Sequence, residues 1–395
     1  MILEIFKLVF LGIQLLLFIY FLLTTIYFLL FSVAGLFPVS QTAAVNGRQN
    51  RFAVLIPGYK EDAVILDVAR QALNQDYPAE FYDVVIIADS FSKETLAELR
   101  KLPLQVIEVV FEISSKAKAL NEAVKRLPGK YDAALILDAD NIMAKDCLIR
   151  MNEALNNGYS AIQGHRTAKN RNTSFAVLDS VSEEINNHIF RKGHRVLGLS
   201  SALIGSGMAF DYLLFKNHIS QIDSTGEDKE LEIRLINAGI KIEYLNDAYI
   251  FDEKVQKSMA FMVQRTRWLA NQLIYAKRYF LWSVRQLITK GNLDLFDKLL
   301  QQLLPPRIFL LGFLVLFSVL SILINPVIYT CAWGILTALC ILTLMFSTPL
   351  RFYNWKTFKA IFLLPKGFFM MLLSLTRIYH ARRKWYHTVH GLDNG

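Results

Sequence analysis

The chain has 395 residues, of which 53% are hydrophobic, and a formal net charge of +9. That length allows one globular unit of about two to three hundred residues plus membrane segments. The apolar residues gather at the two ends and the charges fill the middle, a pattern typical of a membrane protein with a soluble insert. The cationic residues form no basic stripe with interleaved aromatics, which argues against a nucleic-acid partner and favours anionic membrane lipids.

The first apolar segment, residues 2–37, predicts a single membrane helix. The run exceeds the roughly 20 residues that one crossing needs, and it is too short for two crossings and a turn. No cleavage-like site of small residues follows it. We therefore expect residues 1–37 to form an uncleaved anchor.

Short apolar runs alternate with helical periodicity in the region that we predict to be one domain, residues 50–280. The strand-like runs are residues 52–57, 84–88, 106–110 and 133–137. This alternation predicts an α/β fold on a Rossmann-like, mostly parallel sheet with helices on both faces. Ligands of such sheets bind beyond the carboxyl ends of the strands.

Carboxylates and an aromatic residue follow three of these runs. The positions are Pro57, Tyr59, Glu61, Asp89, Asp138 and Asp140. Each acidic residue alone could merely cap a helix, but their recurrence at strand ends predicts one acidic rim. Asp138 and Asp140 are oxygen ligands suited to Mg²⁺ or Mn²⁺, with a nucleotide diphosphate completing the coordination.

Four further segments complete this region. Helix-spaced apolar residues at 175–196 predict an interface-lying helix, and residues 204–210 form a small-residue loop with Gly205, Ser206 and Gly207. Glu227 and Asp228 precede an amphipathic helix at 229–238. The last segment is a helix at residues 259–279, which contains Gln264, Arg267 and Trp268.

The C-terminal part predicts a second membrane element. We expect a connector at 281–305, a helical hairpin at 306–346 broken at Asn325 and Pro326, and an interfacial or re-entrant helix with a basic tail at 356–395. Lys and Arg residues flank these segments on the side of the middle region, which predicts an inner membrane protein with a cytoplasmic domain.

The order of these motifs resembles the family-2 glycosyltransferases, especially the processive-type branch of cellulose, chitin, hyaluronan and poly-N-acetylglucosamine synthases. The resemblance covers residues 52–272. It rests on Pro57-x-Tyr59-x-Glu61, Asp89, Lys116-x-x-Ala119-Leu120-Asn121, Asp138-x-Asp140, Gly226-Glu227-Asp228 and Gln264-x-x-Arg267-Trp268. Two positions depart from many members, because Lys60 stands where Asn is common and Ser90 follows Asp89 in place of a second Asp.

The resemblance implies a GT-A fold, a UDP-sugar donor of glucose or N-acetylglucosamine type, and inversion at the anomeric carbon. It implies a role for each matching residue. The nucleoside pocket is lined by Pro57, Tyr59, Glu61 and Asp89, with Lys116 near the donor, and the nucleotide and metal are contacted by Asp138 and Asp140. The general base is Asp228, beside Glu227. The donor diphosphate is bound by Gln264 and Arg267, and the acceptor by Trp268 and the loop of Gly205, Ser206 and Gly207.

Two acceptor hypotheses and one non-catalytic alternative stay open. A growing polysaccharide is the first choice, a membrane lipid as in ceramide-type glucosyltransferases is the alternative, and a catalytically silent scaffold is the third. Three crossings are few for a polymer channel in one chain, so polymer export would need a partner subunit. The histidines show no metal pattern, and we expect solvation for His165, His188, His194, His380, His387 and His390.

Overall fold

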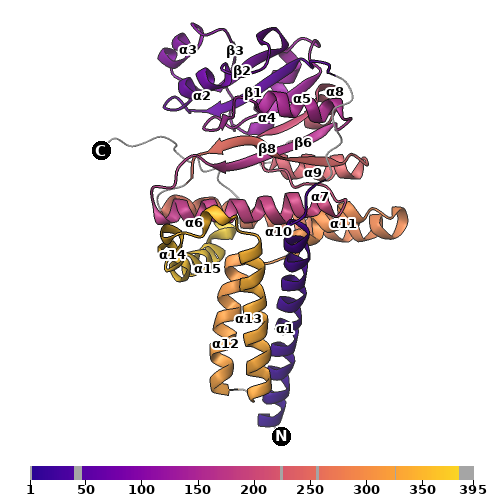
Figure 1. Cartoon of the computed structure of the whole chain (residues 1–395), viewed down its shortest axis with the longest axis vertical. Helices are drawn as coiled ribbons and strands as arrows, with labels where there is room; N and C mark the ends of the chain where they lie inside the picture. The colour runs from indigo at the N-terminus through magenta and orange to yellow at the C-terminus, as the bar shows by residue number, and fades with distance from the viewer. Residues whose placement is uncertain (1, 40–46, 223–225, 255–257, 325, 382–395) are drawn as a thin grey trace.

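The computed structural model describes residues 2–39, 47–222, 226–254, 258–324 and 326–381. An eight-stranded sheet with its covering helices forms one half of the molecule, and three long apolar helices extend away from it (Figure 1). Two further helices lie across the junction between these halves (Figure 1). The prediction of an α/β domain with apolar helices at the N- and C-terminal regions is confirmed.

The sheet has the strand order β3-β2-β1-β4-β7-β6-β8-β5. Its strands are β1 (Phe52–Tyr59), β2 (Tyr82–Asp89), β3 (Gln105–Val109), β4 (Ala133–Ile136), β5 (Ile142–Met143), β6 (Ala161–Ala168), β7 (Met208–Asp211) and β8 (Ile242–Asp252).

The four predicted strands form the parallel half of the sheet, in which β1 lies between β2 and β4. Apart from Asp89 at the end of β2, their buried residues are apolar on both faces, as parallel strands covered by helices require. In the other half β7 runs antiparallel to β4 and β6. β7 lies in what we expected to be a loop at residues 204–210, so the loop ends at Gly207.

Helices cover both faces of the sheet. On one face lie α2 (Ile65–Ala72), α3 (Lys93–Leu99) and α5 (Cys147–Asn156), and on the other lie α4 (Lys116–Arg126), α8 (Tyr212–Ile219) and α9 (Glu227–Asn237). Alternate residues of each strand supply the two cores, so that Val54 packs on one face and Leu55 on the other. Short 3-10 turns occupy Ala79–Phe81, Gln301–Leu303 and Leu350–Phe352.

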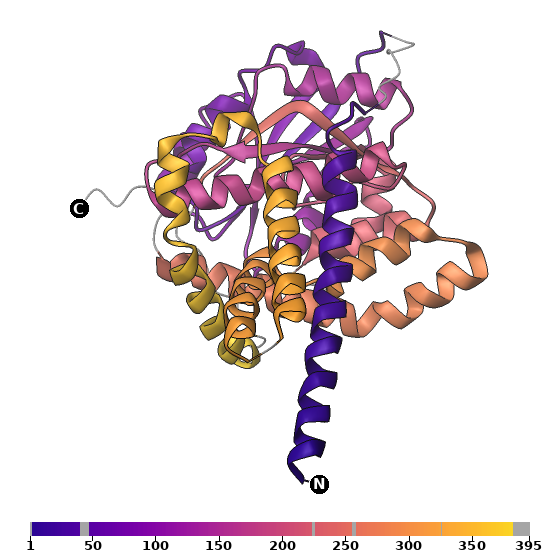
Figure 2. The ribbon, with the colours of Figure 1, turned by 60° about the horizontal axis from the view of Figure 1, so that its bottom comes forward.

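Three described helices are long and apolar enough to cross a membrane: α1 (Ile2–Ala34), α12 (Arg307–Ile324) and α13 (Val327–Phe346). They pack together, with α13 against both α1 and α12 (Figures 1 and 2). The next two helices, α14 (Trp355–Ile361) and α15 (Leu364–Ala381), are bent by 47° at a short break. This pair lies beside α12, on the side away from α1 (Figure 2).

The junction between sheet and apolar helices is formed by two long helical segments. The first is α6 (Ser174–Asn186), which continues into a π-helical turn (Asn187–Gly193) and α7 (His194–Val196). The second is α10 (Ser258–Lys290), followed by α11 (Leu293–Leu300). Both lie across the ends of α12 and α13, directly beneath the sheet (Figure 1).

The prediction of solvated histidines is wrong for His165 and His194, which are 6% and 0% exposed. His165 Nδ1 is 2.7 Å from the Tyr244 hydroxyl, and His194 Nε2 is 3.1 Å from an Asp297 carboxylate oxygen. Partners far away in sequence satisfy both rings inside the junction. His188 is half-buried, and the tail residues His380, His387 and His390 lie outside the side chains that the structure describes.

Because α1 packs closely on the π-helical turn, we expect Gly193→Ala to lower the stability of the protein strongly. An added Cβ would lie 2.2 Å from the Phe31 carbonyl oxygen of α1. We expect a loss of about 1–3 kcal/mol of unfolding free energy, because backbone atoms cannot yield as a flexible side chain can. Thermal unfolding in detergent measures it. The control is Gly334→Ala in α13, where nothing lies within 4 Å and stability should not fall; equal effects would contradict the prediction.

Candidate active site

One continuous cavity of about 2090 Å³ begins at the carboxyl ends of β1, β2 and β4 and extends between the apolar helices. It brings together twelve of the residues that the sequence singled out. They are Pro57, Tyr59, Glu61, Asp89, Lys116, Asp138, Asp140, Gly205, Glu227, Asp228, Arg267 and Trp268.

Lys116 neutralises the acidic centre of this cavity. Ser115 caps α4 by accepting a hydrogen bond from the Lys118 backbone, which places Lys116 in the first turn of that helix. Its ammonium group forms an ion pair with Asp138, lies 3.7 Å from a Glu227 carboxylate oxygen and donates to the Gly205 carbonyl oxygen at 2.6 Å. Burial alone would lower the pKa of Lys116, but Asp138 and Glu227 hold it above its ordinary value.

Asp140 lies deeper in the rim, and burial together with Asp252 and Asp138 raises its pKa well above the ordinary range. The Asn141 side-chain amide donates to Asp140 at 2.9 Å and to Asp252 at 3.0 Å, which joins the end of β4 to the end of β8. The close approach of Asp138 and Asp252 to Asp140 concentrates negative charge at this point, which a divalent cation would neutralise.

The donor chemistry of Asp138 and Asp140 therefore fits Mg²⁺ or Mn²⁺. Within the described residues, no group of three or more His, Cys, Asp or Glu side chains could hold a metal ion. A cation at the Asp pair would thus take its remaining ligands from a bound diphosphate or from water.

The small-residue loop shapes the cavity through its backbone. A Cβ at Gly205 would lie 3.6 Å from the Lys116 ammonium nitrogen and 3.8 Å from an Asp228 carboxylate oxygen. Ser206 is buried, and its hydroxyl accepts a hydrogen bond from the Asp138 backbone at 3.0 Å. Gly207 has φ +65°, and a Cβ there would meet Ile250 at 2.5 Å. The loop thus supports the Asp pair, while Ser206 and Gly207 stay outside the cavity lining.

α9 begins two residues earlier than expected, so Glu227 and Asp228 lie in its first turn. Glu227 is buried, whereas Asp228 is partly exposed and accepts a hydrogen bond from the Lys229 backbone at 2.8 Å. Arg267 and Trp268 face the same cavity from α10. The side chain of Gln264 lies outside the part of the chain that the structure describes.

The cavity also contains charged residues that the sequence did not single out, among them Arg166, Glu183, Asp252, Lys254 and Arg307. Asp252 ends β8 as Asp89 ends β2, so the rule of acidic strand ends would have found it if β8 had been predicted. The other four carried no local signal.

A family model described as "Glycosyltransferase like family 2" matches residues 49–271. The chain belongs to glycosyltransferase family 2. The match covers the sheet, its helices and the start of α10, and thus every position named above except Arg307.

The chain is 28% identical over 266 residues to the beta-monoglucosyldiacylglycerol synthase of Synechocystis sp., covering 64% of this chain and 54% of the relative. It is 24% identical over 234 residues to an N-acetylglucosaminyltransferase of Rhizobium meliloti, covering 54% of each. The chain spans about half the length of these curated relatives. A mannosyltransferase of Pyrobaculum calidifontis, solved with GDP-Man and Mn²⁺, superposes with a TM-score of 0.49 at 16% identity, covering 81% of this chain and 94% of that one.

The buried carboxyl of Glu227 predicts that the stability of the protein depends on pH. Burial, opposed by Lys116 and reinforced by Asp228, raises the pKa of Glu227 to about 7 from its ordinary 4.5. The folded state therefore holds this proton more tightly than the unfolded chain does, and the resulting stabilisation is lost as pH rises through about 7. Glu227→Gln should remove this loss of about 2 kcal/mol between about pH 5 and pH 8.

Thermal unfolding of ligand-free protein in detergent across that pH range measures this difference. The exposed Glu94→Gln variant of α3 is the matched control and should follow the wild type. Parallel pH profiles for wild type and Glu227→Gln would contradict the prediction.

Proposed function

We propose that this glycosyltransferase moves a sugar of glucose or N-acetylglucosamine type from a UDP-sugar onto a hydroxyl group of a membrane lipid. The observation that carries the proposal is the continuity of the cavity, which runs from the Asp138 and Asp140 carboxylates to the space between the apolar helices. A donor with a charged diphosphate suits the first part, and an acceptor with an apolar tail suits the second.

The apolar part of the cavity is formed by helices rather than by the sheet. α12 contributes Phe313 and Leu316, α13 contributes Leu344, and α15 contributes Phe368 and Leu372. Burying hydrocarbon chains against such side chains is favourable at about 25 cal/mol per Å² of apolar surface. A soluble acceptor would gain nothing from these walls, whereas a lipid acceptor would.

The rim supports a nucleotide donor. Tyr59 offers a flat face for a base, and the carboxylates of Glu61 and Asp89 can accept hydrogen bonds from base N–H groups. Asp138 and Asp140 would hold Mg²⁺ or Mn²⁺, which when bound supplies positive charge against the diphosphate. Arg267 adds a guanidinium group that can bind a diphosphate through two hydrogen bonds.

Asp228 is the proposed general base. One of its oxygens accepts from the Lys229 backbone, and the other lies beside Gly205 at the cavity wall. It would take the proton of the acceptor hydroxyl while that oxygen bonds to the anomeric carbon and the UDP leaves from the opposite face. A single displacement of this kind inverts the anomeric configuration and needs no covalent sugar-enzyme intermediate.

The three apolar helices support a multi-pass protein of a bacterial-type inner membrane with its catalytic domain in the cytoplasm. Exposed cations on α10, including Lys277, Arg278 and Arg285, precede α12 along the chain, between the catalytic domain and the apolar hairpin. Lys and Arg enrichment beside membrane helices is typical of the cytoplasmic side. On this topology α14 and α15 would form an interfacial or re-entrant element.

A growing polysaccharide is the second candidate acceptor. The complete Gln264-to-Trp268 motif favours this acceptor. The name of the Rhizobium meliloti relative, an N-acetylglucosaminyltransferase, supports N-acetylglucosamine as the sugar. A polymer would need a partner subunit for export, because three apolar helices are few to enclose a channel. A catalytically silent scaffold would retain the fold without turnover, and the survival of all expected acidic positions argues against it.

The deciding experiment is UDP release by the detergent-purified full chain, with Mg²⁺ or Mn²⁺, across a panel of UDP-sugars and with membrane lipid extract as acceptor. A labelled product that partitions into organic solvent with one added sugar would support the lipid acceptor. A ladder of polymer would favour the second candidate, and absence of any metal-dependent release would favour the scaffold.

Two substitutions should separate base from donor binding. We expect Asp228→Asn to lower turnover by about 10²–10⁴-fold while retaining UDP binding, because it removes the proton acceptor alone. Asp140→Asn should weaken metal-dependent UDP binding, because it removes a ligand of the cation. Titration of UDP with and without Mn²⁺ measures binding, and UDP release measures turnover. Equal loss of UDP binding in both variants would rule out this division of roles.

A further inference from the structure

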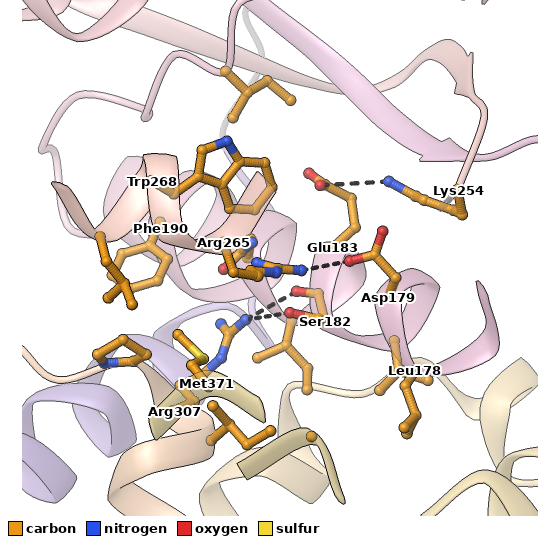
Figure 3. Close-up of a pocket in the computed structure, with 18 of the residues that line it drawn as sticks. Leu178, Asp179, Ser182, Glu183, Phe190, Lys254, Arg265, Trp268, Arg307 and Met371 are labelled. Atoms are coloured by element: carbon orange, nitrogen blue, oxygen red, sulfur yellow. Dashed lines mark hydrogen bonds and ion pairs between the residues drawn. The ribbon is translucent and has the colours of Figure 1, made fainter. Parts of the chain in front are cut away.

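A cluster of buried charges lines the cavity between the acidic rim and the apolar walls (Figure 3). Glu183 of α6 is its centre, with ion pairs to Arg166 at 3.0 Å, Arg191 at 3.2 Å and Lys254 at 3.6 Å. Lys254 also pairs with Asp252 at 2.6 Å, and Arg265 pairs with Asp179 at 2.5 Å. Each carboxylate of this cluster is thus already engaged.

Arg307, the first residue of α12, is an additional cation beside this cluster. Its Nη2 donates to the carbonyl oxygen of Ser182 at 3.0 Å and to the hydroxyl oxygen of Ser182 at 3.1 Å (Figure 3). Its Nη1 is buried without a hydrogen-bond partner. Among the described side chains, no carboxylate forms an ion pair with Arg307, and its charged neighbours are Arg265, Glu183 and Arg191.

Arg307 therefore has no counter-ion of its own among the described side chains. The nearby carboxylates Asp179, Glu183 and Asp252 form their ion pairs with other cations. A buried guanidinium without a counter-ion is strongly unfavourable, and a second arginine nearby makes it more so. Because Arg307 and Arg265 both line the cavity, a ligand can supply the missing negative charge.

The surroundings indicate what kind of anion fits. Leu178, Phe190 and Met371 line the same part of the cavity, with Met371 next to Arg307 (Figure 3). Apolar side chains of α12, α13 and α15 form the rest of its lining. An anion at this position would have hydrocarbon on one side and the catalytic rim on the other. Arginine binds phosphate oxygens in pairs, which makes phosphate the best match.

We propose that Arg307, with Arg265 beside it, binds the phosphate of an anionic lipid whose chains occupy the apolar part of the cavity. The inference rests on the proposed lipid acceptor and narrows it to a phospholipid whose head group carries a hydroxyl beyond the phosphate. Ser182 is a positioning residue, because it orients the Arg307 guanidinium through two hydrogen bonds.

The test measures binding of short-chain lipids to the full-length protein in neutral detergent, without any donor. The probes are dihexanoyl phosphatidylglycerol, dihexanoyl glycerol and inorganic phosphate. The wild type should bind the phospholipid about tenfold or more tightly than the neutral lipid, the effect expected of a charged, two-point hydrogen bond. Arg307→Gln should lose that preference, Arg307→Lys should keep part of it, and Ser182→Ala should weaken it less than Arg307→Gln does.

The matched control is Arg285→Gln, which removes an exposed cation of α10 outside the cavity and should leave the preference unchanged. Equal phospholipid affinity in wild type, Arg307→Gln and Ser182→Ala would overturn the inference. A loss of UDP binding in Arg307→Gln would also overturn it, because this arginine would then bind the donor diphosphate. A third contrary result is complete displacement of the phospholipid by inorganic phosphate at the same concentration. Because no donor is present, these outcomes are independent of whether sugar transfer to lipid is found.

Discussion

Compensation of charge at Glu183 is the interaction on which the junction of this protein depends. One carboxylate of α6 holds Arg166 from β6, Arg191 from the π-helical turn and Lys254 from the segment after β8. Because these ion pairs neutralise it, the charged face of α6 can pack against the sheet. On the other side of the helix, Ile185 packs with α1 and α12. Without such neutralisation, burying these cations next to apolar helices would be prohibitively unfavourable.

The same principle organises the acidic rim. The Lys116 ammonium group forms ion pairs with both Asp138 and Glu227, and Asp140 and Asp252 share the side-chain amide of Asn141. The rim gathers several carboxylates, whereas Arg307 has no carboxylate partner among the described side chains. This distribution of charge is consistent with the proposed cation and diphosphate at one end of the cavity and the proposed anionic lipid at the other.

The sequence predictions that the structure confirms are those based on local patterns of residues. Apolar runs marked the strands of the parallel half, and the residues that follow β1, β2 and β4 meet in one cavity as expected. β7 was missed because its four residues follow directly on a glycine-rich loop and give no separate apolar run. His165 and His194 were misjudged because their partners Tyr244 and Asp297 are distant in sequence.

The sequence by itself determined the α/β class, the apolar helices, the family and the candidate catalytic residues, since each depends on hydrophobic periodicity or on a short motif. Only the tertiary structure decided what surrounds those residues. The contacts that matter here join segments that are far apart along the chain. They are the ion pair of Glu183 with Lys254, the amide link from Asp140 to Asp252, and the hydrogen bonds of Arg307 with Ser182. Their electrostatic energy depends on distance and burial, and neither quantity can be read from the order of residues.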